Sequence, residues 1–281
     1  MAIRWKCLTP IFLFALAAGC NYNSTPKSIE SCPPAVTLEI PATDPIDSIE
    51  SDSSDSLSEY ALVHADKRLH NVVTQTRNAF VGVDNFHRHV RGSGTYYTFN
   101  DYHLVITAAH VVDGNAELIG ITTPSGERVL ARIIYFNMMG RDDLAALLLD
   151  SPLESRVPMD LEFRDLSGDK AEQLVGESVI YTGSPGHHEQ LTITGRVGGY
   201  TSGGSIIMHS YAWGGASGSN IFDNRGRLIG ILKAVDINRS GISPYPQLTE
   251  DIVWITPTSG LDLERLAVVL EIHRLISQLE D

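Results

Sequence analysis

The stretch YAWGGASGSN, at residues 211–220, decides how the rest of the sequence is interpreted. Two adjacent glycines, an alanine and a Ser-Gly-Ser run stand between an aromatic pair and the apolar run that follows. Glycine and alanine have little side chain to bury, and glycine loses the most backbone entropy on folding. Such a turn is favoured only where the backbone must approach another group closely. The stretch therefore predicts a turn whose backbone, together with Ser217, takes part in function.

Two other motifs supply complementary chemistry. TAAHVV at 107–112 places His110 at the end of an expected strand, and DDLAALLLD at 142–150 places an acid directly before a buried one. Taken singly, the three motifs have commoner explanations: a structural histidine, a solvated acidic turn and a Gly-rich hairpin. Together, a histidine, an aspartate and a serine at strand boundaries supply a base, its orienting acid and a nucleophile. The combination favours nucleophilic catalysis.

Between these motifs the sequence consists of short apolar runs separated by Gly, Asn, Asp and Pro. This pattern is typical of a β-sandwich or of one or two β-barrels. We expect twelve strands, at residues 79–83, 94–99, 103–107, 116–122, 128–136, 144–149, 177–182, 191–198, 204–208, 219–223, 228–235 and 252–256.

Helices are expected only near the two ends of this β-rich region. Apolar spacing predicts an amphipathic helix near residues 60–75. A second helix is expected after Pro257, with Ser259 and Asp262 as an N-cap pair. Its apolar stripe consists of Leu266, Val269, Leu270, Ile276 and Leu279.

The first residues have the pattern of an export signal. Arg4 and Lys6 precede the apolar run IFLFALAAG, which is too short to span a bilayer. The run ends in ALAAGC, which resembles the lipobox of bacterial lipoproteins, although Ala17 stands where that motif prefers leucine. The resemblance implies a lipoprotein signal peptide at 1–19 and lipidation of Cys20. An ordinary signal peptide cleaved nearby, or an uncleaved anchor, is the alternative.

Residues 20–59 are expected to form a disordered tether. They are rich in Ser and Pro, and residues 21–59 hold eight acidic side chains against one lysine. Such a composition buries too little apolar surface to offset the entropy lost on ordering. The whole chain has a net charge of −13, which argues against nucleic acid as a partner. Cys7, Cys20 and Cys32 are the only cysteines, so the folded region has no disulfide framework.

In its motifs the chain is similar to the trypsin-like serine proteases, most of all to the protease domain of the bacterial HtrA (DegP) family. The segments that carry the resemblance follow in order: GSGTYYTFNDYHLVITAAHVVDG, DLAALLL, GESVIYTGSPG, LTITGRVGG, GASGSNIFDNRGRLIGIL and IVWITPTSGLDL. The resemblance runs from about Tyr60 to about Leu270, and we expect a protease domain at 60–281. It implies an all-β, chymotrypsin-like fold of two six-stranded antiparallel β-barrels, with an N-terminal and a C-terminal helix, and no cofactor.

Residue roles follow from the same resemblance. His110 is the general base, Asp143 rather than Asp142 is the orienting acid, and Ser217 is the nucleophile. The backbone N–H groups of Gly215 and Ser217 form the oxyanion hole, which explains the small residues of the opening stretch. Ala216 stands where the digestive enzymes have an aspartate that a newly cut N-terminus pairs, so no such zymogen switch is expected.

Specificity is expected to differ from that of trypsin. Tyr211 occupies the place of the acidic determinant of trypsin, so cleavage after Lys or Arg is not expected. By analogy with HtrA, the pocket for the residue before the scissile bond would be lined by Ala212, Ala234 and Ile252. These residues suit a small aliphatic side chain.

Other features bear on metals, regulation and assembly. His87 and His89, and the pair at 187–188, are interpreted as exposed loop histidines, and no metal site is expected. Residues 261–281 are enough for a helix but not for the PDZ domain that HtrA proteins usually carry. The oligomeric state stays open.

The sequence thus predicts a serine endopeptidase that is lipid-anchored to a bacterial membrane, on its periplasmic or cell-surface side. Its expected substrates are unfolded or exposed segments of extracytoplasmic proteins. A catalytically silent binding module with the protease fold is the alternative. A lipase or esterase is disfavoured because that fold orders its triad as Ser, acid, His along the chain.

Overall fold

The computed structural model describes residues 69–114, 119–140, 142–187, 190–238 and 247–280. The predicted signal peptide at 1–19, the tether at 20–59 and the lipidation site Cys20 lie outside the described residues. So do residues 60–68, the first part of the expected N-terminal helix.

The first half of the described chain forms seven strands and two α-helices. They are α2 (His70–Ala79), β1 (Phe80–Asn85), β2 (Val90–Phe99), β3 (Tyr102–Thr107), α3 (Ala109–Val112), β4 (Ile119–Thr122), β5 (Arg128–Asn137), β6 (Leu144–Leu149) and β7 (Met159–Asp160). The second half of the described chain forms six strands, two α-helices and two 3₁₀-helices, which are labelled η. It contains α4 (Asp169–Glu172), β8 (Ser178–Gly183), η2 (Pro185–His187), β9 (Leu191–Tyr200), β10 (Ile206–His209), β11 (Asn220–Phe222), β12 (Leu228–Asn238), β13 (Gln247–Pro257), η3 (Thr258–Gly260) and α5 (Leu263–Glu280).

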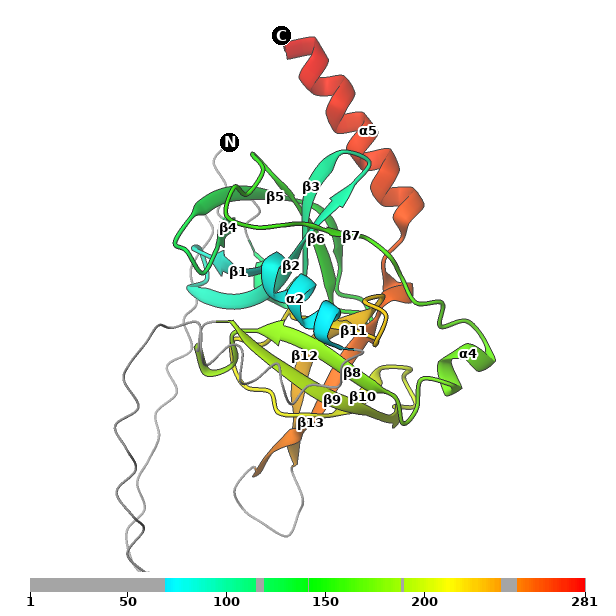
Figure 1. The fold of residues 1–281 in the computed structure, drawn as a ribbon. Coiled ribbons are helices and arrows are strands. Elements are labelled where there is room, and N and C mark those ends of the chain that lie inside the picture. The colour runs from blue at the N-terminus through cyan, green and yellow to red at the C-terminus, as the bar shows by residue number, and fades with distance from the viewer. Residues whose placement is uncertain (1–68, 115–118, 141, 188–189, 239–246, 281) are drawn as a thin grey trace, which may run out of the picture. The chain divides into compact units, whose positions relative to one another are not determined.

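Strands β1 to β6 form the first barrel. Their order in the sheet is β1-β4-β5-β6-β3-β2, and antiparallel pairing between β1 and β2 closes the ring. The two-residue strand β7 pairs in parallel with β2 at Tyr97 and Thr98, beyond the part of β2 that pairs with β1. The second barrel is closed in the order β10-β13-β12-β11-β8-β9, and the two barrels can be followed in Figure 1. The predicted class, two six-stranded antiparallel barrels, is confirmed.

All twelve predicted strands are present, although most of their observed ends move by one to three residues, and residues 116–118 of the fourth predicted strand lie outside the described residues. Strand β7 was not predicted, because two residues carry no recognisable alternation. Every residue of β6 is buried, which matches the continuous apolar run LAALLL. A run of this kind is apolar on both faces, and burying each leucine fully contributes roughly 1.5–3 kcal/mol.

The two longer helices flank the barrels at either end of the described chain. Helix α2 is amphipathic and buries Val72, Val73 and Ala79. It runs to Ala79, so the predicted range of 60–75 ends four residues early.

The helix α5 begins as expected, since Asp262 Oδ1 accepts a hydrogen bond of 2.9 Å from the Arg265 N–H. The other member of the predicted cap pair, Ser259, lies in η3 instead.

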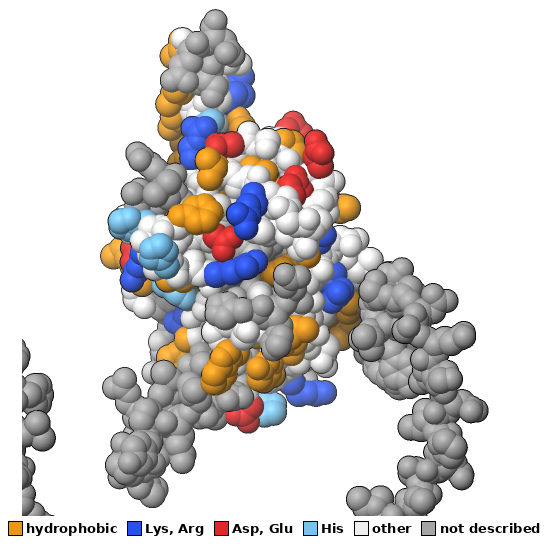
Figure 2. Space-filling view, turned by 90° about the vertical axis from the view of Figure 1, so that its left-hand side faces the viewer, with side chains coloured by type: hydrophobic (Ala, Val, Ile, Leu, Met, Phe, Trp, Pro, Cys, Tyr) orange, Lys and Arg blue, Asp and Glu red, His pale blue; other side chains and the backbone are white. Residues whose placement is uncertain are grey.

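The predicted apolar stripe of α5 is only half correct. Leu266 and Leu270 are buried against the first barrel, but Ile276 is 51% and Leu279 is 87% exposed. The reason is geometric, because the helix continues past the edge of the barrel (Figure 1). Figure 2 shows hydrophobic side chains along one side of the projecting helix. None of the helices in the described ranges is long and apolar enough to cross a membrane.

The second barrel depends on close strand packing at Gly230 in β12. A Cβ atom at this position would collide with Ile255 Cγ2 and lie 2.5 Å from the backbone oxygen of Thr256. We therefore expect Gly230→Ala to lower the free energy of unfolding by about 1–3 kcal/mol, the usual cost of overpacking. Urea unfolding followed by circular dichroism measures this change.

Gly198 on strand β9 is the matched control. The nearest atom to a Cβ added there is 3.8 Å away, in ordinary contact. Gly198→Ala should change the unfolding free energy by less than about 0.5 kcal/mol. Equal destabilisation by the two substitutions would contradict the packing argument.

Candidate active site

His110 and Asp143 are brought together by strand pairing in the first barrel. His110 lies in α3, directly after β3, and Asp143 directly precedes β6. Strands β3 and β6 are antiparallel neighbours, with Thr107 opposite Ala145. The end of one strand therefore lies beside the start of the other, and the two side chains meet.

The pair is joined by two hydrogen bonds. His110 Nδ1 lies 2.6 Å from Asp143 Oδ2, and the backbone N–H of His110 donates to Asp143 Oδ1 over 2.9 Å. A carboxylate can only accept, so Nδ1 is assigned as the protonated nitrogen and Nε2 keeps its lone pair. The His110 side chain is 32% exposed and that of Asp143 is 14% exposed. The geometry leaves Nε2 able to accept a proton while the acid is mostly shielded.

Asp142 points elsewhere, although it is adjacent in the sequence. Its Oδ2 accepts a hydrogen bond of 2.9 Å from Asn137 Nδ2. A Cβ atom on Gly260 would lie 3.0 Å from Asp142 Oδ1. Asp142 thus belongs to the contact between the β5–β6 turn and the segment before α5, and Asp143 is the partner of His110.

Ser217 comes from the second barrel, in the turn between β10 and β11. The backbone N–H of Ser93, in β2, donates to the carbonyl of Ser217 over 2.8 Å. The next residue, Gly218, has φ +88°, and a Cβ atom there would collide with Ser93 O and with Thr107 Oγ1. Only glycine fits this position. The turn is therefore pressed against the end of β3, three residues before His110.

Asn220 fixes the other end of the turn to the first barrel. It accepts a hydrogen bond of 3.0 Å from Tyr97 Oη, and its amide donates to Ile106 O (2.9 Å) and Gly218 O (3.1 Å). Burial raises the pKa of Tyr97 well above its ordinary value, so the phenol stays a donor. The serine turn is thus held by strands β2 and β3 of the other barrel.

The histidine and the serine lie at the same interface between the two barrels, which is called the seam below. A Cβ atom on Gly92 would lie 2.8 Å from both Val111 Cγ1 and the carbonyl oxygen of Ser217. Val111 is adjacent to His110, so both halves of the site border Gly92. Across the described residues, no hydrogen bond joins Ser217 Oγ to His110.

Two backbone N–H groups of the turn are available to a ligand. The Gly214 carbonyl accepts a hydrogen bond of 2.7 Å from the Gly186 N–H. The chain has no cis peptide bonds in its described parts, so the Gly215 N–H points in the opposite direction from that carbonyl. Neither Gly215 N–H nor Ser217 N–H donates to any acceptor among the described residues. Both can bind an oxygen atom of a ligand.

The three predicted substrate-binding residues differ in accessibility. Tyr211 is 45% exposed, and its carbonyl accepts a hydrogen bond of 2.5 Å from Tyr181 Oη. Ala212 is fully buried in the core of the second barrel. Ala234, in β12, is partly buried. Tyr211 and Ala234 thus keep solvent-exposed surface, whereas the buried Ala212 has none with which to line a pocket.

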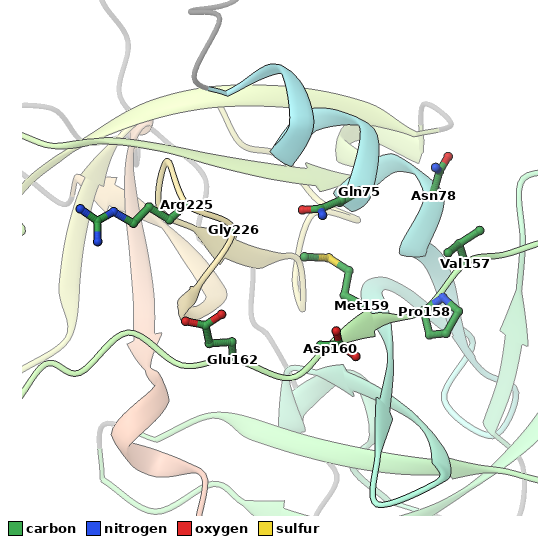
Figure 3. A pocket seen from close by; sticks show the side chains of 9 residues that line it. All are labelled: Gln75, Asn78, Val157, Pro158, Met159, Asp160, Glu162, Arg225 and Gly226. Carbon is green, nitrogen blue, oxygen red and sulfur yellow. The ribbon is translucent and has the colours of Figure 1, made fainter.

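Two hollows lie away from these residues. Figure 3 shows the first, of about 280 Å³, between α2, β7 and the turn that carries Arg225. The second, of about 460 Å³, lies between residues 163–167 and the start of α5. Neither contains His110, Asp143 or Ser217. Within the described ranges, no three or more His, Cys, Asp or Glu side chains are grouped to hold a metal ion.

Ser93 and Asn220 were missed as site residues by the sequence analysis. Both lie inside the quoted motifs, and a signal was present, since each is a polar residue placed within or at the start of an apolar strand. Both are fully buried. A buried polar side chain needs a partner, and the sequence does not show which one.

Two six-stranded antiparallel barrels, with a His–Asp pair on the first and a glycine-flanked serine from the second beside it, define the chymotrypsin-like class. Residues 92–231 match the family model of the trypsin-like peptidase domain. The chain therefore carries a trypsin-like peptidase domain, and all three candidate residues lie inside the matched range. No curated protein has a matching sequence.

Solved structures of proteases share the fold. The protease Rv3671c from M. tuberculosis, in an inactive form, aligns with a TM-score of 0.52 and 18% identity, over 73% of this chain and 93% of that chain. A serine endoprotease from Yersinia pestis aligns with a TM-score of 0.52 and 18% sequence identity, over 70% of this chain and 64% of that chain. The HtrA-type protease AlgW, with a tripeptide, aligns with a TM-score of 0.53 and 21% sequence identity, over 73% of this chain and 62% of that chain. This chain spans less than two thirds of the last two structures.

The two neighbouring aspartates provide a test of the site. Asp143→Asn should slow labelling by a fluorophosphonate by roughly 10⁴-fold, because an amide holds His110 in the wrong tautomer. Asp142→Asn is the matched control and should leave the labelling rate almost unchanged. Rates measured by in-gel fluorescence give both values. A larger effect at Asp142 would overturn the assignment.

Proposed function

We propose that this chain is a serine endopeptidase that hydrolyses peptide bonds through His110, Asp143 and Ser217. One observation carries the proposal. The His110–Asp143 pair lies at the interface between the barrels, beside a serine turn in which the Gly215 and Ser217 N–H groups donate to no acceptor among the described residues. A base, its orienting acid, a nucleophile and oxyanion donors are what acyl transfer requires.

In the first step, Ser217 Oγ attacks the carbonyl carbon of the peptide bond. A serine hydroxyl is a weak nucleophile, so His110 Nε2 takes its proton as the new C–O bond forms. Asp143 accepts from Nδ1 and stabilises the resulting imidazolium. The negative charge that develops on the substrate oxygen is bound by the N–H groups of Gly215 and Ser217.

The tetrahedral intermediate then collapses. The carbon–nitrogen bond breaks, and the imidazolium of His110 gives its proton to the leaving amine. This leaves an acyl ester on Ser217. Water then attacks the ester with His110 again as the base, which releases the carboxylic acid and restores the serine. Hydrogen bonds between nucleophile and base are often long before substrate binds, so we expect the Ser217–His110 contact to form with substrate.

The proposed substrates are unfolded or exposed protein segments, as the resemblance to HtrA proteases suggests. The anchoring of the chain to a membrane through Cys20 stays a prediction of the sequence. So does its location on the periplasmic or cell-surface side.

The nucleophile is tested by Ser217→Ala. We expect the substitution to abolish fluorophosphonate labelling and to lower peptide hydrolysis by at least about 10⁴-fold. The fold should remain, because the Ser217 hydroxyl forms no hydrogen bond among the described residues and alanine keeps the backbone contacts of the turn, and circular dichroism checks this. Failure of the unaltered protein to label would favour the alternative, a binding module with the protease fold.

Specificity is tested by profiling cleavage of a peptide library. We expect Val, Ala or Ile before the scissile bond, because Tyr211 is uncharged and Ala234 is small. Tyr211→Asp places a carboxylate where trypsin has its acidic determinant, so this variant should shift the preference towards Lys and Arg. A preference of the unaltered protein for Lys, Arg or Glu would show that the pocket assignment is wrong.

A further inference from the structure

Ser93 lies where three segments of the chain meet. Its hydroxyl donates to the Gly215 carbonyl over 2.8 Å and accepts from the Ser184 N–H over 3.0 Å. Its backbone N–H donates to the Ser217 carbonyl over 2.8 Å, and its carbonyl accepts from Thr107 Oγ1 over 2.7 Å. Ser93 is fully buried, so its hydroxyl cannot exchange these partners for water. One residue of the first barrel thus contacts both Gly215 and Ser217.

These contacts fix the orientation of Gly215. This residue has φ +95°, in the region that favours glycine, and a glycine can rotate its flanking peptide planes with little steric resistance. The plane before Gly215 is held by the bond from Gly186 N–H to Gly214 O, and the plane after it is held by the Ser93 hydroxyl. Without the hydroxyl, the Gly215 carbonyl loses this hydrogen bond, and the plane after Gly215 is held only by the Ala216 N–H, which donates to the Trp213 carbonyl over 3.0 Å.

Strand β2 holds the hydroxyl rigidly. A Cβ atom on Gly92 would lie 2.7 Å from Val111 Cγ2, and one on Gly94 would lie 2.7 Å from Val105 Cγ1. The backbone on both sides of Ser93 is therefore packed directly against neighbouring side chains. This packing leaves the strand little freedom to move the serine away from the turn.

We propose that Ser93 is a positioning residue that holds the serine turn through its hydrogen bond to the Gly215 carbonyl. The inference rests on the proposed function, since it concerns the same turn. Ser93 touches no substrate. It acts through Gly215, whose N–H would bind the substrate oxygen as negative charge develops in the transition state.

The test compares the kinetics of Ser93→Ala with those of the unaltered protein on one peptide substrate. Misplacing one oxyanion donor should lower kcat by roughly 10–100-fold, less than the 10²–10³-fold loss of a whole donor. KM should change little, because the ground-state carbonyl depends less on the oxyanion donors. Ser93→Cys keeps a weak hydrogen-bond donor, so its kcat should lie between that of Ser93→Ala and that of the unaltered protein. An unchanged kcat in correctly folded Ser93→Ala would overturn the proposal.

A pair of inhibitors separates positioning from a general loss of structure. A peptidyl aldehyde forms a hemiacetal with Ser217 whose oxygen occupies the oxyanion site, whereas the matching peptidyl alcohol forms no such adduct. In Ser93→Ala, the inhibition constant of the aldehyde should rise by the same factor by which kcat/KM falls. That of the alcohol should stay constant. If Ser93→Ala weakened the binding of the aldehyde and of the alcohol equally, the role of Ser93 would be merely structural.

The matched control is Thr123→Val, which also removes one buried hydroxyl from the first barrel. The Thr123 hydroxyl bonds to Ser125, Glu127 and Ser155, none of which belongs to the site. This variant should lose stability but keep kcat and the affinity for the aldehyde. A loss of kcat equal to that of Ser93→Ala would also overturn the proposal.

A measurement independent of catalysis separates this proposal from the proposed function. ¹⁵N relaxation dispersion should show new exchange at the Gly215 amide in Ser93→Ala and none in Thr123→Val. If the unaltered protein hydrolyses no peptide, the proposed function fails. The relaxation dispersion of the Gly215 amide still tests whether Ser93 holds the turn. If the protein is active and neither the amide nor kcat responds, only the role of Ser93 is refuted.

Discussion

The contact between the serine turn and strands β2 and β3 is the interaction on which the rest of the site depends. It joins the two barrels through Ser93 N–H to Ser217 O and through Asn220 to Tyr97 and Ile106. Because these groups are buried, each bond that is broken would leave a donor or an acceptor without a partner, at a cost of about 1–3 kcal/mol. The serine and the histidine come from different barrels, so this seam determines their relative position.

The close approach at the seam explains the small residues of the turn. Gly218 cannot carry a side chain, because Ser93 and Thr107 occupy the space. A similar constraint acts at Gly183, where a Cβ atom would collide with Ser219 Oγ. The Ser219 hydroxyl is buried without a hydrogen-bond partner in the described residues, which is unfavourable by itself. The turn is therefore tightly packed against the first barrel, at the cost of one buried hydroxyl that has no hydrogen-bond partner in the described residues.

Much of the secondary structure was predictable because it depends on local patterns. Twelve short apolar runs became twelve strands, and LAALLL was recognisable as a buried strand from its composition alone. Two of the misses show what local patterns cannot predict. The two-residue strand β7 is too short to carry a period. In α5, Ile276 and Leu279 follow the same helical spacing as Leu266 and Leu270, and only the position of the barrel edge separates exposed from buried residues.

The candidate site likewise combines features that the local sequence determines with features that depend on the tertiary structure. The sequence by itself determined which residue types are present, in what order and at which strand boundaries, because chemistry and glycine-rich turns are local features. The resemblance indicated Asp143 rather than Asp142, but only the tertiary structure showed how the register of β3 against β6 brings Asp143 to His110 while Asp142 turns to Asn137. It also decided that Ser93 and Asn220 hold the serine turn. Ser93 and Gly215 lie 122 residues apart in the sequence, and Asn220 and Ile106 lie 114 apart, so the packing of the two barrels rather than local spacing brings these partners together.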